Sequence, residues 1–188
     1  MGEVDWVASL APRLEKEIQR TDQSLAIETA QRLAYSLEIR SYGRTNQQSL
    51  MSYQTDLLIR ETSEDGSWKP RLIVEVKVES VSTHDAITYS QKAAAHKNLH
   101  PYLRYGFLIG GNKEFSLPGR LIRHGLEFDF MISWPSLEPS DAEVLSLAKL
   151  ILDEVAASRS LESIVFDTRA KDRDRYVCLH RPLVLTKG

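Results

Sequence analysis

The 188-residue chain has little cysteine, no long apolar run and almost no net charge. Its single cysteine, Cys178, excludes an intrachain disulfide and a thiolate cluster around zinc, and it fits a reducing cytoplasm. No stretch approaches the ~20 consecutive apolar residues that are needed to cross a bilayer. The N-terminal segment also lacks the basic n-region of a secretory signal. These absences predict a cytoplasmic protein without a membrane span.

The formal net charge of −2 argues against a surface coated with positive charge for non-specific binding to nucleic acid. This net charge is still compatible with a local basic groove, because affinity for phosphate depends on where the charges lie. Basic residues cluster at 92–104, 120–124 and 169–181, and each cluster taken alone is more typical of a solvated face. With 42% hydrophobic and 27% charged residues, the composition predicts a single globular domain over 1–188.

Periodicity and turn residues predict helices and strands that alternate along the chain. Apolar residues at helical spacing, together with cap residues, predict helices at about 4–20, 22–38, 83–99 and from 140 onward. Apolar runs and alternation predict strands at about 38–42, 53–61, 72–80, 105–111, 126–133, 163–168 and 176–185. The Asp65-Gly66 pair predicts a turn at 62–70 that joins two of these strands as an antiparallel hairpin. This order predicts an α/β (α+β) fold with a central mixed β-sheet flanked by helices.

The stretch LIVEVKVES, residues 72–80, carries charge inside an apolar strand. Alternation puts Glu75 and Lys77 on one face, and the hairpin brings Asp56 alongside them. Two carboxylates at this distance repel each other unless a cation lies between them, and Mg²⁺ prefers such oxygen ligands. A surface ladder of ion pairs on an edge strand is the alternative interpretation of the same residues.

Asp56, then Glu75-Val76-Lys77 after a hairpin, then a helix and the apolar strand at 105–109, resemble the PD-(D/E)XK nuclease superfamily. The resemblance covers about 22–110 and implies a restriction-endonuclease-like core, with 111–188 packed on it as a C-terminal extension. It also implies Mg²⁺, or Mn²⁺ in its place, with Asp56, Glu75 and the backbone carbonyl of Val76 as metal ligands. Lys77 would orient the attacking water and stabilise charge on the phosphate.

The same resemblance suggests two more catalytic positions. Members often add a glutamate from the helix before the first strand, and Glu28 is the candidate, with Glu17 and Glu38 as alternatives that spacing does not separate. Some members carry glutamine and, four residues on, tyrosine in the following helix. Here Gln91 fills the first position and Ala95 stands at the second.

Two features of this helix carry further expectations. The resemblance also implies that Lys92, next to Gln91, is a candidate phosphate contact. His96 and His100 lie four residues apart, as zinc ligands can, but the sequence offers no third ligand. Surface positions near the helix end are therefore expected for both histidines.

The sequence thus predicts a Mg²⁺-dependent endonuclease that hydrolyses DNA phosphodiester bonds in restriction, repair or defence. A homodimer is expected, because cleaving both strands of a duplex commonly uses two sites related by two-fold symmetry. The alternative is a catalytically inactive domain with the same core that binds nucleic acid or protein.

Overall fold

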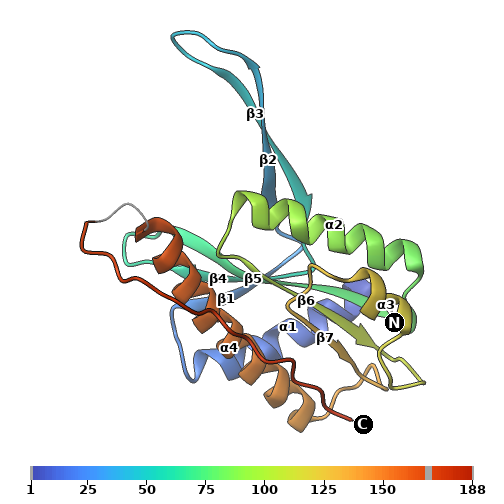
Figure 1. Cartoon of the computed structure of the whole chain (residues 1–188). Coiled ribbons are helices and arrows are strands. Elements are labelled where there is room, and N and C mark those ends of the chain that lie inside the picture. The colour runs from blue at the N-terminus through green and yellow to red at the C-terminus, as the bar shows by residue number, and fades with distance from the viewer. Residues whose placement is uncertain (1, 168–170, 188) are drawn as a thin grey trace.

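The computed structural model describes residues 2–167 and 171–187, and it contains an α/β fold built on a five-stranded mixed sheet (Figure 1). Its strands, in spatial order, are β1 (Leu25–Thr29), β4 (Leu57–Thr62), β5 (Trp68–Val78), β6 (Arg104–Gly110) and β7 (Phe130–Ser133). The pairs β1/β4 and β4/β5 are antiparallel, and the pairs β5/β6 and β6/β7 are parallel. The mixed sheet flanked by helices agrees with the predicted fold class.

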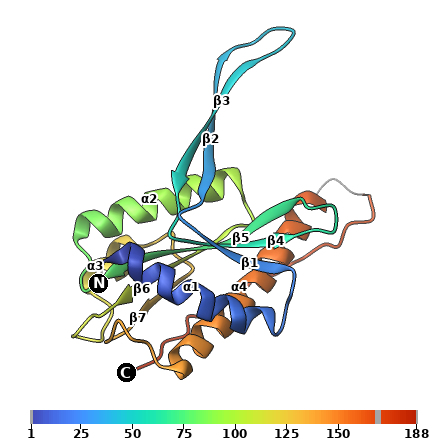
Figure 2. The same cartoon turned by 180° about the vertical axis from the view of Figure 1, so that it is seen from behind.

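Helices cover both faces of this sheet (Figures 1 and 2). On one face lie α1 (Glu3–Gln19) and α4 (Asp141–Phe166), and on the other lie α2 (Thr83–Leu99) and the short α3 (Gly119–His124). Alternation along β5 divides its side chains between two cores, since Leu72 and Val74 belong to the α1/α4 core and Ile73 belongs to the α2 core. Both faces of β5 are therefore buried, and any charged residue on it needs a partner.

Between β1 and β4 the chain forms a two-stranded antiparallel ribbon of β2 (Arg32–Ser41) and β3 (Gln47–Gln54). Both views show it extending past α2 and away from the rest of the molecule (Figures 1 and 2). Only its base is packed: Leu33 is buried in the α2 core, whereas almost every residue from 37 to 50 is exposed.

Two predicted helices are confirmed together with their caps. The bounds of α2 are those predicted, and the Ser82 side chain and Asp85 bond each other's backbone N–H in a capping box. Ser140 and Glu143 form the same box at the start of α4. The hairpin around Gly66 also joins antiparallel strands, β4 and β5, as predicted.

The predicted helix at 22–38 is wrong, because this segment forms β1 and the first part of β2. Its apolar spacing fits a helix, but Leu33, Leu37 and Ile39 fit a strand equally well. Ala30, between the two strands, has a φ of 54°, a left-handed conformation that ends β1 and turns the chain toward the ribbon.

The two late strands are also wrong. Residues 163–166 continue α4, position 168 lies outside the described residues, and 176–185 have no strand. The described segment 171–187 instead runs along α4 (Figure 1), where Arg181 donates a hydrogen bond of 3.0 Å to the buried Glu154. Within the described residues, no helix is both long and apolar enough to span a membrane.

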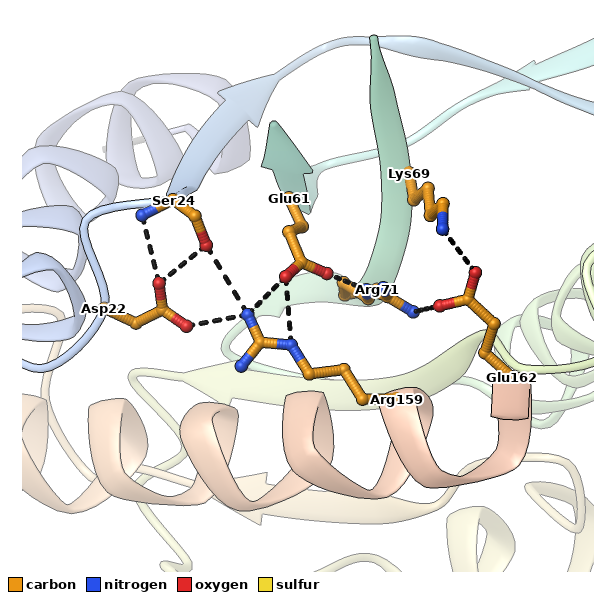
Figure 3. A network of polar contacts seen from close by, with 7 residues as sticks. All are labelled: Asp22, Ser24, Glu61, Lys69, Arg71, Arg159 and Glu162. Atoms are coloured by element: carbon orange, nitrogen blue, oxygen red, sulfur yellow. Dashed lines mark hydrogen bonds and ion pairs between the residues drawn. The ribbon is translucent and has the colours of Figure 1, made fainter. Parts of the chain in front are cut away.

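Ion pairs tie the end of α4 to the strand ends beneath it (Figure 3). Arg71 is 4% exposed and contacts Glu61 at 2.5 Å and Glu162 at 2.6 Å. Arg159 extends this network, pairing with Glu61 at 2.5 Å and with Asp22 at 2.7 Å. The loop before β1 and strands β4 and β5 are thereby joined to one helix.

Candidate active site

Asp56 and Glu75 meet where β4 begins alongside β5. Leu57 pairs with Val74, so the antiparallel register carries Asp56 next to Glu75. Asp56 is held there by its Oδ2, which accepts a hydrogen bond of 2.8 Å from the backbone N–H of Val76. Before it, the N–H and hydroxyl of Thr55 both donate to the carbonyl of Gln31, at 2.9 and 3.0 Å, which fixes the backbone.

Glu75 lies on the α2 face of the sheet and is only 1% exposed. Its Oε1 accepts hydrogen bonds from Lys92 Nζ at 2.9 Å and from the Tyr105 hydroxyl at 2.6 Å. Burial is the main cause that raises the pKa of Glu75 to about 7; the charge of Asp56 adds to this rise, while Lys92 and Tyr105 act in the opposite direction. The charge of Asp56 is therefore close enough to Glu75 to affect its ionisation.

Lys77 shares this face, two residues further along β5. Its Nζ donates to both carboxylate oxygens of Glu3 on α1, at 3.1 and 3.2 Å. Burial opposes its charge, but the bonds to Glu3 and the neighbouring Tyr89 dominate and raise the pKa of Lys77. Lys77 is thus cationic, and among the described residues no hydrogen bond joins it to Asp56 or Glu75.

Tyr89, on α2, links the two lysines of the site. The ammonium groups of Lys77 and Lys92 each lie 5.2 Å from the centre of its ring. A cation above an aromatic face is attracted by the ring quadrupole, more strongly where water is excluded. The site is therefore a cluster of two acids and two cations around one aromatic ring.

His96 and His100 correct a prediction, since neither lies on the open surface. His96 is fully buried, and burial lowers its pKa to about 4, so the ring is neutral at pH 7. Its Nε2 lies 3.3 Å from the carbonyl of Leu33, and its Nδ1 lies 3.4 Å from the Tyr105 hydroxyl. The His100 ring contacts the carbonyl of Ala34 at 3.1 Å. The pair thus holds the base of the ribbon on α2.

Glu28 does not lie on a helix as predicted; it lies in β1, opposite Leu58. Its Oε1 accepts a hydrogen bond of 2.8 Å from Arg60. Both line a pocket of about 270 Å³ together with Gln31 and Trp68. Glu28 therefore faces the same side of the sheet as Glu75, with its carboxylate engaged by Arg60.

The other sequence candidates lie elsewhere. Glu17 pairs with Arg20 on α1, and Glu38 is exposed on the ribbon. Gln91 points to solvent from α2. The adjacent Lys92 binds the carboxylate of Glu75 instead, and it also donates a 3.0 Å hydrogen bond to the carbonyl of Gln54.

Three residues of the cluster were not predicted as site residues: Tyr89, Tyr105 and His96. Tyr89 and Lys92 are three residues apart, so a helix presents them on one side. Tyr105 is the second residue of β6. Its parallel pairing with Ile73 puts its side chain on the same face of the sheet as Glu75. Helical spacing could have revealed Tyr89, but Tyr105 needed the register of two strands.

A divalent cation is chemically compatible with these residues. Among residues 2–167 and 171–187, no group of three or more His, Cys, Asp or Glu side chains could hold a metal ion. Mg²⁺ usually needs only one or two protein carboxylates, with water and substrate oxygens completing its shell, and Asp56 and Glu75 supply two. The ammonium of Lys92 already neutralises Glu75, so a bound cation would compete with it.

In comparisons with known proteins, no family model matches the sequence, and a search of curated proteins finds no match.

Proposed function

We propose that the protein is a Mg²⁺-dependent endonuclease of the PD-(D/E)XK type that hydrolyses DNA. The observation that carries this proposal is the convergence of Asp56, just before β4, and Glu75, within β5, with Lys77 on the same strand face as Glu75. The order of elements around them supports it: the antiparallel pair β4/β5, then α2, then the parallel strand β6. This is the order on which the resemblance to restriction endonucleases rests.

Asp56, Glu75 and the Val76 carbonyl would hold the metal ion. When bound, Mg²⁺ supplies charge neutralisation at the phosphate and activation of water at neutral pH. Lys77 would contribute a fixed positive charge toward the phosphate, since Glu3 and Tyr89 keep its amine protonated. Lys92 supplies a second positive charge beside Glu75. For DNA cleaved on both strands, we propose a homodimer with two such sites.

The test is cleavage of supercoiled, linear and single-stranded DNA with Mg²⁺, with Mn²⁺ and with EDTA. Lys77→Ala is expected to lower the cleavage rate by about 100-fold or more, the usual effect of removing one group that stabilises transition-state charge. Lys69→Ala is the matched control, because Lys69 lies on the same strand and forms a similar ion pair, with Glu162 at 2.6 Å. Cleavage that persists unchanged in Lys77→Ala would exclude this mechanism.

A non-catalytic binding domain is the second candidate, and the internal pairing of charges favours it. Lys77 is bound by Glu3 and Glu75 is bound by Lys92, so each charge has a partner without any substrate. On this proposal the protein binds DNA equally well with and without divalent cations and cuts none of the three substrates. Calorimetric binding of Mn²⁺ that is lost in Asp56→Asn supports the nuclease instead.

A further inference from the structure

The ribbon formed by β2 and β3 is an exposed, projecting element that the proposed site does not use. From Arg32 to Gln54 it carries three arginines and a single acid, Glu38, in a chain whose net charge is −2. Arg40 and Arg44 are exposed, and neither pairs with a carboxylate in the described part of the chain. The tip also presents the exposed Tyr42. A surplus of unpaired positive charge on a projecting element suggests an anionic partner.

The base of the ribbon is fixed to the candidate active site. His96 and His100 contact the carbonyls of Leu33 and Ala34, and Lys92 donates to the carbonyl of Gln54 at 3.0 Å. The same Lys92 amine binds Glu75 at 2.9 Å. The direction of the ribbon is therefore tied to the helix that covers the carboxylates.

The connection along the chain is equally short. The last residue of β3, Gln54, comes two residues before Asp56. A molecule that contacts the base of the ribbon would thus lie next to both carboxylates.

We propose that the β2–β3 ribbon enters a groove of duplex DNA and holds the duplex against the carboxylate site. This inference depends on DNA being the partner, as in the proposed function, and it adds the element that grips it. The major groove of B-DNA is about 12 Å wide and admits a two-stranded β-ribbon. Two strands lie ~4.8 Å apart, so the ribbon with its side chains matches that width. Arg40 and Arg44 would contact the phosphates or base edges.

A second copy of the chain is the competing occupant, because one face of the ribbon is apolar. Leu37 and Leu50 pair across its strands and are 42% and 69% exposed, and Ile39 adds to them. Charge argues for DNA: two copies would bring like-charged arginines together, whereas a duplex neutralises them. Polar residues dominate the rest of the tip, at 43–49.

The test measures anisotropy of a fluorescein-labelled 24-base-pair duplex in EDTA, so that cleavage does not interfere, at 50 to 200 mM NaCl. Arg40→Ala/Arg44→Ala is expected to weaken binding by about tenfold or more at 100 mM and to lower the salt slope by about 2. Arg13→Ala/Arg20→Ala is the control with the same loss of charge, on α1 and at its C-cap, at the opposite face of the sheet, and is expected to bind like the unchanged protein.

Unchanged affinity and slope in Arg40→Ala/Arg44→Ala would overturn the inference, as would a lack of duplex binding by the unchanged protein. A dimer that dissociates in Leu37→Ser/Leu50→Ser while duplex affinity stays the same would also overturn it. Cleavage separates the two proposals. If Lys77→Ala abolishes cutting but Arg40→Ala/Arg44→Ala changes neither cutting nor binding, only the ribbon inference is wrong. If the ribbon arginines are needed for binding but the protein cuts no DNA, only the proposed nuclease activity is wrong.

Discussion

Glu75 and His96 both contact the Tyr105 hydroxyl, yet their pKa values move in opposite ways. Burial raises the pKa of Glu75 to about 7 from an ordinary 4.5 and lowers that of His96 to about 4 from 6.5. Between pH 4.5 and 7 the folded state holds the Glu75 proton that the unfolded state has lost, so Glu75 makes stability fall as pH rises. Between pH 4 and 6.5 the unfolded state protonates His96 first, so His96 makes stability rise with pH.

The two effects oppose each other from pH 4.5 to 6.5, and Glu75→Gln is expected to remove one of them. The variant should gain stability relative to the unchanged protein as pH rises through this window, by about 2–3 kcal/mol, since one proton corresponds to about 1.4 kcal/mol per pH unit. Urea unfolding at pH 4.5, 5.5, 6.5 and 7.5 measures this difference. Glu64→Gln, in the exposed β4–β5 turn, is the control and should run parallel to the unchanged protein. Parallel curves for Glu75→Gln as well would contradict the assigned burial effect.

At the residue scale, the sequence led to the acidic pair but not to its surroundings. Alternation along one strand and a recognisable turn were enough to bring Asp56 next to Glu75, because both depend on local pattern. Lys92 was a minor candidate, yet its ammonium forms the ion pair with Glu75. Gln91, chosen by family pattern, points to solvent. Packing decides which residues of a helix face the sheet. The spacing of a helix residue from a neighbouring motif does not determine this.

At the scale of elements, helices that begin with a capping residue were predicted correctly, whereas a helix inferred from weak apolar periodicity was not. The helices that begin at Thr83 and Asp141 each have a side chain that binds the free N–H groups of the first turn. The segment 22–38 has no comparable cap, and small residues such as Ala30 are compatible with both periods. The pairing of β1 with β4 and of β2 with β3 decided its structure. A local sequence pattern does not predict which distant strand a segment pairs with.

The ion-pair network at the end of α4 yields a prediction about how this element is held (Figure 3). Arg71→Met would leave the carboxylates of Glu61 and Glu162 without the buried guanidinium that lies between them. The expected loss is about 1–3 kcal/mol of unfolding free energy, because Glu61 and Glu162 lose their buried partner and keep only the more exposed Arg159 and Lys69.

Arg13→Met is the matched control for this change. Arg13 pairs with Asp141, whose side chain is fully exposed, so the expected loss is below about 0.5 kcal/mol. Urea unfolding of both variants at pH 7 gives the comparison. Equal losses would mean that the network contributes no more than a surface ion pair.

Over the whole molecule, burial divides the chain into a rigid sheet and a projecting ribbon. The centres of β5 and β6 are fully buried, with Val74, Val76 and Leu108 at 0% exposure. Residues 37–50 of the ribbon have only their own cross-strand bonds and an open surface. Local opening of such an element needs far less free energy than global unfolding.

Native-state hydrogen exchange is therefore expected to separate the two regions. Amides of β5 and β6 should exchange only by global unfolding, and those at 37–50 should exchange about 1,000-fold faster or more. Replacing 37–50 with an Asn-Gly turn should leave the midpoint of thermal unfolding within about 3 °C, because the deleted part contributes little to either core. Protection of the ribbon equal to that of β5 in the free protein would mean that another surface covers it in solution. Added duplex DNA should slow exchange at 37–50, and it should slow β5 and β6 by no more than the same factor, because binding to the folded protein also raises the free energy of global unfolding. A duplex that slows β5 and β6 but leaves 37–50 unchanged would mean that DNA binds elsewhere.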